Sequence, residues 1–281
     1  MYAAIIPARN EEKNIIATLT TIRRLPMHYI IVVINGCTDQ TLHLIQTHTH
    51  AIQDLRLHII YFPEPLGIDI PRAIGALYAQ YLHCRGALFV DGDMSGPIGH
   101  NLNRLYQTIE SGVDVALTNC YPYISDRTKL AQLVLRFRGR LNRELHLFKT
   151  LGLATPTHGP HALSARALAL LPAEALAIPP LTLYWAQRHQ LKIAVATSIK
   201  HKDLQSPRRN NRHARMVAKT IIGDCVMALY LAQNQPVSRS LGKHEFLGYH
   251  PERRFDLLLR WQNAVTHDPE FLRQHLIRFS E

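Results

Sequence analysis

The first 120 residues alternate between short apolar runs and segments in which apolar residues recur every three or four positions. Short apolar runs bounded by turn residues are typical of buried strands, and the wider spacing is typical of amphipathic helices. Strands that alternate with helices predict an α/β fold with a mostly parallel central sheet and helices on both faces. The predicted strands are Tyr2–Pro7, Tyr29–Ile34, Leu57–Tyr61, the run that ends at Asp91, and Val113–Thr118.

The second half of the chain is less regular, and it divides the sequence into parts 1–120, 121–235 and 236–281. The last part is charged and is predicted to be helical in places. Helices are predicted over Lys129–Leu151, Ser164–Leu171 and Met216–Gln233, a loop over Thr155–His161, and a strand over Lys192–Lys200. Asp224 and the tryptophans Trp185 and Trp261 are interpreted as structural residues.

Composition indicates a globular protein with an anionic partner. Hydrophobic residues make up 47% of the chain, the formal net charge is +11, and the isoelectric point is near 9.7. Such a charge favours a nucleotide diphosphate, an anionic lipid or a nucleic acid as the partner. The basic segments lack interleaved aromatic residues, which argues against nucleic acid.

The four cysteines lie far apart without a CxxC pair, so a zinc site and a disulfide framework are not expected. This usage favours a reducing, cytoplasmic location. The sequence contains no apolar run of 18 residues or more, so a membrane-spanning helix is not expected. It leaves open peripheral contact with the inner face of an anionic membrane, and it leaves open a homodimer.

Polar residues follow three of the predicted strands at the same edge of the sheet. Pro7, Asn35 and Asp91 stand at those strand ends, where parallel sheets bind their ligands. Asp91 and Asp93 are one residue apart, so in an extended chain their carboxylates point the same way. Two such carboxylates suit a divalent cation that carries a phosphorylated substrate.

Further candidate residues surround these strand ends. Arg9 and Glu11 follow the first strand and could contact a base, a ribose or a phosphate. Asn35 could bind a base edge, and Gly36 would let the backbone approach it. Gly67 permits a similar approach, and Arg72 near a helix start offers a charge for a phosphate or a carboxylate. In isolation, each of these segments is also compatible with an ordinary turn or helix cap.

Taken together, the segments IIPARNEE, VINGCTDQT, PLGIDIPRAIG and FVDGDM resemble the family 2 glycosyltransferases and their relatives with the GT-A fold. The resemblance covers residues 1–120 best. It implies Mg²⁺ or Mn²⁺ and a nucleotide-sugar donor, and it makes Asp93 the metal ligand with Asp91 nearer the ribose. The family usually has an aspartate where this chain has Asn35. The implied donor-binding residues are Pro7, Ala8, Arg9, Glu11, Asn35, Gly36, Gly67, Arg72, Asp91 and Gly92.

The second half resembles the retaining enzymes that make glucosyl- or mannosyl-3-phosphoglycerate. Glu174 is the only carboxylate between His161 and Asp203, so the acidic pair of inverting relatives has no counterpart. The resemblance implies that His201 completes the metal site. It also implies a basic loop that closes over the diphosphate, with Arg208, Arg209 and Arg212, and an acceptor loop with Gly159, Pro160 and His161.

These observations predict a metal-dependent hexosyltransferase that uses a UDP or GDP sugar and an anionic small-molecule or lipid-phosphate acceptor. One alternative is a sugar-phosphate nucleotidyltransferase, although no glycine-rich loop follows the first strand. A second alternative is a non-catalytic protein that binds anions or nucleic acid through its positive charge.

Overall fold

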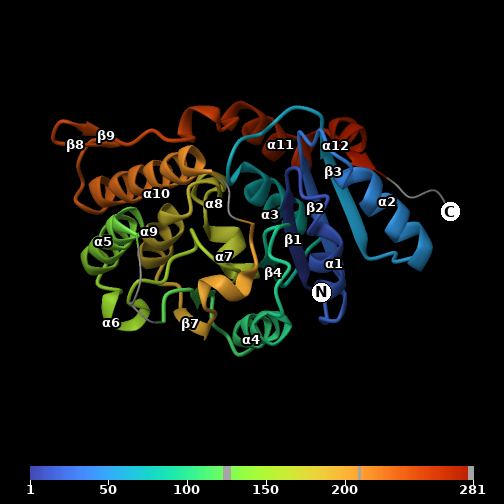
Figure 1. Cartoon of the computed structure of the whole chain (residues 1–281), viewed down its shortest axis with the longest axis horizontal. Coiled ribbons are helices and arrows are strands. Elements are labelled where there is room, and N and C mark those ends of the chain that lie inside the picture. Colours follow the sequence, from blue (N-terminus) through green and yellow to red (C-terminus); the bar gives the residue numbers. More distant parts are fainter. Residues whose placement is uncertain (123–127, 208–209, 278–281) are drawn as a thin grey trace.

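The computed structural model describes residues 1–122, 128–207 and 210–277. This part of the chain contains an eight-stranded sheet in the order β10-β3-β2-β1-β4-β6-β5-β7 (Figure 1). Four of its strand pairs are parallel and three are antiparallel, so the predicted mostly parallel sheet is confirmed. The strands are β1 (Ala3–Ala8), β2 (Tyr29–Asn35), β3 (Leu57–Phe62), β4 (Gly86–Phe89), β5 (Val115–Asn119), β6 (His161–Ser164), β7 (Ile193–Ser198) and β10 (Leu276–Ile277).

Alternate residues of the central strands pack into two separate apolar layers. In β1, Ala3 and Ile5 join one layer, whereas Ala4 and Ile6 join the other. Because successive side chains of a strand point to opposite faces, this alternation requires helices on both faces, as predicted. One layer contains α3 (Ile70–Tyr81), α7 (Ala165–Leu170), α8 (Ala173–Ala177) and α9 (Pro180–Arg188), and the other contains α1 (Ile15–Arg23), α2 (Thr41–Ile52) and α4 (Gly99–Glu110).

The short strand β6 was not predicted. It inserts antiparallel between β4 and β5, and His161 is its first residue rather than the end of a loop. Four residues with the sequence HALS are too few to show a two-residue period. The single helix predicted over Lys129–Leu151 is in fact two, α5 (Lys129–Glu144) and α6 (Phe148–Leu151). His146 separates them with a left-handed φ of 59°.

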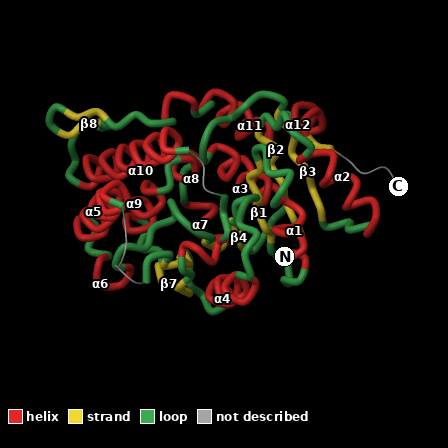
Figure 2. The backbone as a smooth tube through the Cα atoms, in the orientation of Figure 1, coloured by secondary structure: helices red, strands yellow, loops and turns green. Residues whose placement is uncertain are grey.

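The segment after β7 returns across the molecule and contributes to both of its ends (Figure 2). A short turn, η1 (His201–Leu204), leads to α10 (Asn211–Ala232), which packs against α5 and α9. The tail then adds the hairpin β8 (Ser240–Leu241) and β9 (His244–Glu245), the turn η2 (His250–Glu252), and the helices α11 (Phe255–His267) and α12 (Pro269–His275).

The tail is part of the core, although it was predicted only as a charged and partly helical segment. Its last strand, β10, pairs with β3. Trp261 on α11 is fully buried, as its structural interpretation requires, and its Nε1 donates a hydrogen bond to the Ile74 carbonyl oxygen at 3.1 Å. No helix among the described residues is long and apolar enough to cross a membrane.

Candidate active site

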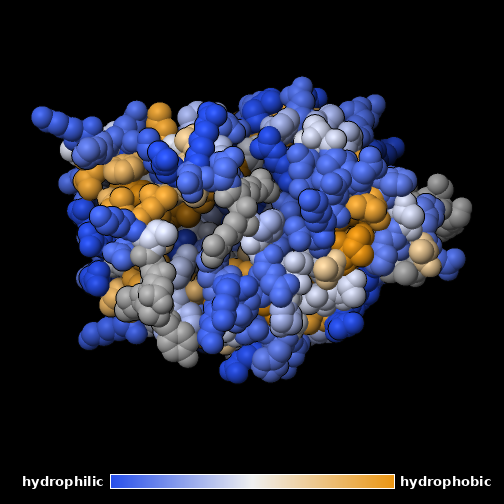
Figure 3. Space-filling model, viewed as in Figure 1, coloured by the Kyte–Doolittle hydropathy of each residue, from blue (hydrophilic) through white to orange (hydrophobic). Residues whose placement is uncertain are grey.

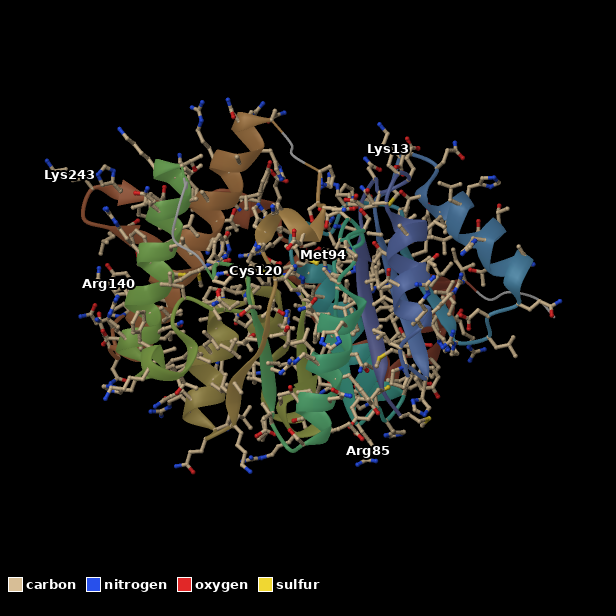
Figure 4. All side chains as sticks on the ribbon, turned by 60° about the horizontal axis from the view of Figure 1, so that its bottom comes forward. Lys13, Arg85, Met94, Cys120, Arg140 and Lys243 are labelled. Atoms are coloured by element: carbon tan, nitrogen blue, oxygen red, sulfur yellow. The ribbon has the colours of Figure 1, made fainter. Side chains whose placement is uncertain are left out.

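The carboxyl ends of β1, β2 and β4 open into a cavity of about 640 Å³. Residues from α10 and the turn before α11 form the opposite wall. Met94, which lines this cavity, lies between the two halves of the molecule (Figure 4). The structure therefore brings together the three strand ends that the sequence predicted to converge.

Residues after β1 and β2 form one wall of the cavity and also hold each other in place. Arg9 is exposed at this wall, and Glu11 is buried there, with its backbone N–H donating to the Thr41 hydroxyl oxygen at 2.7 Å. Asn35 lines the wall, but both ends of its amide are engaged within the protein. Its Oδ1 accepts from the Leu66 N–H at 2.6 Å, and its Nδ2 donates to the Gly67 carbonyl oxygen at 3.2 Å.

Asp91 and Asp93 lie beyond the end of β4 and both line the cavity. Arg72, in the first turn of α3, holds Asp91 in a bidentate pair, with Nη2 at 2.6 and 2.7 Å from the two carboxylate oxygens. Burial by itself would lower the pKa of Arg72, but attraction to Asp91 and Asp69 outweighs it and raises that pKa. Arg72 therefore stays charged and fixes one carboxylate of the Asp91–Asp93 pair.

The Asp91–Arg72 pair is one end of a chain of buried ion pairs. Arg72 also donates to Asp69 at 2.7 Å, and Asp69 in turn accepts from Arg253 at 2.9 Å. Arg253 donates to both oxygens of Asp224, at 2.7 and 2.8 Å. At the other end of this series, Arg239 donates to Asp224 at 2.5 Å. The chain links the tail and α10 to the Asp91–Asp93 pair, and we call it the ion-pair chain.

Two histidines from different segments meet at the cavity. The Nε2 of His158 lies 3.2 Å from the Nδ1 of His201, and the stacked ring of Tyr121 covers His158. Burial, together with the charges of Arg138 and His201, lowers the pKa of His158 well below its usual value. A neutral imidazole is the form that binds a metal or accepts a proton.

The described residues contain no preformed cluster of three or more potential metal ligands. However, Asp93 and His201 line the same cavity as Asp91. Carboxylates and an imidazole suit Mn²⁺, and Mg²⁺ commonly binds through one or two carboxylates with substrate phosphates supplying further ligands. The residue types present therefore fit a divalent cation that arrives with a diphosphate.

Some of the predicted site residues do not line the cavity. Gly36 is not among the lining residues, and a Cβ added to it would approach the Pro65 nitrogen to 2.5 Å. Gly159, Pro160 and His161 also lie outside the lining. His161 instead stacks on Phe89 at 4.7 Å in the sheet, and burial and the Arg72 charge lower its pKa to about 3.

The basic loop is described only in part. Arg208 and Arg209 lie outside the described residues. Arg212 is exposed and lines a smaller hollow, which shares His213 and Tyr249 with the main cavity.

The wall that α10 contributes was not predicted from the sequence. Five residues of this helix line the cavity at helical spacing, namely His213, Val217, Thr220, Ile221 and Asp224. The sequence carried one signal, because a carboxylate within a helix as apolar as this one needs a buried cationic partner. Asp224 has two such partners, Arg239 and Arg253, which agrees with its interpretation as a structural residue. Its place in the ion-pair chain was not predicted.

Comparison with known proteins identifies the class of fold and then the family. Among solved structures, the chain resembles glucosyl-3-phosphoglycerate synthase from Mycobacterium tuberculosis in complex with Mn²⁺ and UDP-glucose, with a TM-score of 0.61 and 18% identity over 85% of this chain and 80% of that one. The same enzyme in complex with phosphoglyceric acid gives a TM-score of 0.60 and 17% identity over 85% and 81%. These likenesses identify the GT-A glycosyltransferase fold.

Residues 3–169, more than half of the chain, match Glycosyl transferase family 2. The protein belongs to this family and is a glycosyltransferase. A comparison with curated proteins gives no significant match.

Proposed function

We propose that the protein is a metal-dependent hexosyltransferase that uses a UDP or GDP sugar and an anionic acceptor. The observation that carries this proposal is the position of Asp91 and Asp93, which line one cavity together with the ends of β1 and β2. A nucleotide-sugar needs both features, a pocket for the nucleotide and carboxylates that hold a cation on its diphosphate.

We assign the wall that is formed by the residues after β1 and β2, here called the strand-end wall, to the nucleotide. Pro7, Ala8, Arg9 and Glu11 would contact the base and ribose, together with the turn at Gly67 that Asn35 holds. Because Arg72 already occupies both oxygens of Asp91, we assign the metal to Asp93 and His201 and assign Asp91 to the ribose. When bound, the cation would neutralise the charge that develops on the leaving diphosphate.

The chain's own residues would orient the donor. Arg72 keeps Asp91 in one rotamer through a bidentate pair, so the ribose would meet a fixed acceptor of hydrogen bonds. Arg208, Arg209 and Arg212 are proposed to add positive charge over the diphosphate. The net charge of +11 supports an anionic acceptor. The similar mycobacterial synthase has been crystallised with phosphoglyceric acid, which is such a compound.

The test is a panel of UDP- and GDP-hexoses, with binding followed by thermal shift and turnover followed by nucleotide release. We expect Mn²⁺ or Mg²⁺ to be required, and EDTA to abolish turnover. Asp93→Ala should lower kcat by about 100-fold or more, since several kcal/mol of charge stabilisation would be lost. The matched control Glu270→Ala changes an exposed carboxylate on α12 and should leave kcat unchanged.

Three outcomes would contradict the proposal. The first is wild-type turnover by Asp93→Ala in the presence of EDTA. The second is pyrophosphate release from a sugar phosphate and a nucleoside triphosphate, which would indicate a nucleotidyltransferase. The third is a salt-sensitive shift with RNA or DNA and no binding of any nucleotide-sugar, which would indicate a non-catalytic binder.

A further inference from the structure

The cavity extends beyond the strand-end wall and reaches one face of α10. His213, Val217, Thr220 and Ile221 line it at helical spacing, so a single face of a single helix forms this wall. Tyr249 lies beside this wall, and its hydroxyl is 2.8 Å from the His213 Nδ1. The proposed donor and metal would occupy the opposite side, so the α10 face is available to the acceptor.

An apolar strip continues from this wall onto the surface. We define the apolar strip as Leu130, Phe137, Ile221 and Phe246, which pack on one small cluster of α5 and α10, together with Leu133. Leu133 is three positions from Leu130 and four from Phe137, so it shares their face of α5. Leu133 is 38% exposed and the other four are partly exposed. Figure 3 shows hydrophobic side chains gathered over α5 and α10 beside a hollow. Because Ile221 lines the cavity and also belongs to the strip, the two are continuous.

Exposed cations lie on the same elements as the apolar strip. Exposed basic residues occur on both helices and on the hairpin, and Arg140 and Lys243 point outward on the same side of the molecule (Figure 4). An apolar strip with a cationic border complements an amphiphile that has a hydrocarbon chain and an anionic head group. The exposed basic residues of this border are Lys129, Arg136, Arg140, Arg215, Lys219 and Lys243.

Two of the carboxylates that line the cavity, Asp69 and Asp224, are already held in ion pairs. Both oxygens of Asp224 accept from Arg253, and one also accepts from Arg239. The two oxygens of Asp69 accept from Arg72 and Arg253. All four carboxylate oxygens are therefore engaged in buried ion pairs. An acceptor that is already an anion at neutral pH, such as a phosphate monoester, needs no base.

From these observations we infer that the acceptor is a lipid phosphate, with its phosphate at the α10 face of the cavity and its hydrocarbon chain along the apolar strip. This inference rests on the proposed function. In the reaction, a phosphate oxygen of the lipid forms a bond to C1 of the hexose. The bond between C1 and the β-phosphate oxygen of the donor breaks, and the nucleotide diphosphate leaves with the electron pair. No proton is transferred.

The test compares farnesyl phosphate, farnesol and 3-phosphoglycerate as acceptors, with UDP-glucose and GDP-mannose as donors and Mn²⁺ present. We expect glycosylated farnesyl phosphate and no product from farnesol. The value of kcat/KM for 3-phosphoglycerate should be at least about tenfold lower, because one buried apolar segment contributes more than 1.4 kcal/mol. Equal or better use of farnesol or 3-phosphoglycerate would overturn the inference.

A variant tests the strip itself. Leu133→Gln should raise the KM for farnesyl phosphate about fivefold, because it removes apolar area that the farnesyl group would cover. The matched control Leu259→Gln changes an exposed leucine of α11, 60% accessible, and should leave that KM unchanged. An unchanged KM in Leu133→Gln would show that the strip does not bind the hydrocarbon chain of the lipid.

Two further results separate this inference from the proposed function. Hydrolysis of the donor with Mn²⁺ but no transfer to farnesyl phosphate would refute the lipid acceptor and leave the donor and metal site intact. A failure to bind any nucleotide-sugar would refute the proposed function itself. Light scattering tests whether a second copy of the protein occupies the strip instead. A dimer that Leu133→Gln dissociates would show that it does.

Discussion

The ion-pair chain predicts that a residue of the tail supports the donor site. Arg253 is fully buried and bridges two carboxylates, Asp224 at 2.7 Å and Asp69 at 2.9 Å. Asp69 holds Arg72, which holds Asp91. The change Arg253→Gln removes the charge in the middle of this chain and keeps a side chain of similar polarity.

Breaking one side of a buried ion pair costs about 3–5 kcal/mol, because the remaining charge loses its partner. Here Asp224 keeps Arg239 and Asp69 keeps Arg72, so we expect the lower end, about 3 kcal/mol. That is a large share of the roughly 5–15 kcal/mol by which a folded protein is stable. Asp69 would then draw Arg72 toward itself and loosen Asp91. We therefore also expect the KM for the nucleotide-sugar to rise about tenfold, since a charge-assisted contact contributes about 1.4 kcal/mol or more.

Urea unfolding measures the first effect, and donor KM in saturating Mn²⁺ measures the second. The matched control is Arg254→Gln, at the next position in the chain. Arg254 pairs with Asp256 and Glu64 at the surface, where ion pairs contribute little, so neither quantity should change. A conservative variant, Arg253→Lys, keeps the charge but cannot reach both carboxylates as a guanidinium does, and should fall between the two.

Two results would refute this reasoning. Unfolding of Arg253→Gln at the wild-type urea concentration would show that the ion pairs contribute nothing net to stability. Lower stability with an unchanged donor KM would show that Arg253 supports the fold without positioning Asp91.

Two other predictions concern the backbone and pH. Gly67→Ala should destabilise the fold by more than Gly112→Ala, because both glycines have positive φ but only at Gly67 would a Cβ meet the tail, 2.4 Å from the Glu252 carbonyl oxygen. Urea unfolding of both variants checks this, and equal losses would contradict it. Burial lowers the pKa of His161 to about 3, so the folded protein keeps this imidazole neutral while the unfolded chain protonates it below about pH 6.5. The stability that depends on the neutral imidazole is therefore complete above pH 6.5 and is lost as the pH falls toward 3. Between pH 7 and pH 5 the wild type should lose about 2 kcal/mol more stability than His161→Gln, and parallel losses in urea unfolding would contradict this.

The first half of the chain could be predicted because its signals are local in sequence. Each of the first strands is a continuous apolar run, since both of its faces are covered, and each ends in a turn residue. The chemistry then follows from topology, because parallel strands place Pro7, Asn35 and Asp91 at one edge of the sheet. The turns after β1 and β2 also hold each other, since the Asn10 Oδ1 accepts from the Thr38 N–H at 2.8 Å.

The second half of the chain could not be predicted in the same way, because the residues that line the cavity there come together only through packing. His213 and Tyr249 are 36 positions apart, and Asp224 meets Arg253 across 29. A helix as apolar as α10 predicts burial on every side, and periodicity does not reveal that one of its faces borders a cavity. The contact between His158 and His201 also forms only through packing, since His158 precedes β6 and His201 follows β7.

The tail and the donor loop form one structural unit, although they are almost 190 residues apart. The Arg254 N–H donates to the Leu66 carbonyl oxygen at 2.9 Å, and the Arg253 Nε donates to that of Ile68 at 3.2 Å. At Gly67, between these two contacts, the absence of a Cβ lets the Glu252 backbone pack directly against the loop. The same loop ends at Asp69, whose contact with Arg72 fixes Asp91. The sequence divides the chain into three parts, but in the structure contacts with the tail hold the loop from Leu66 to Asp69 in place.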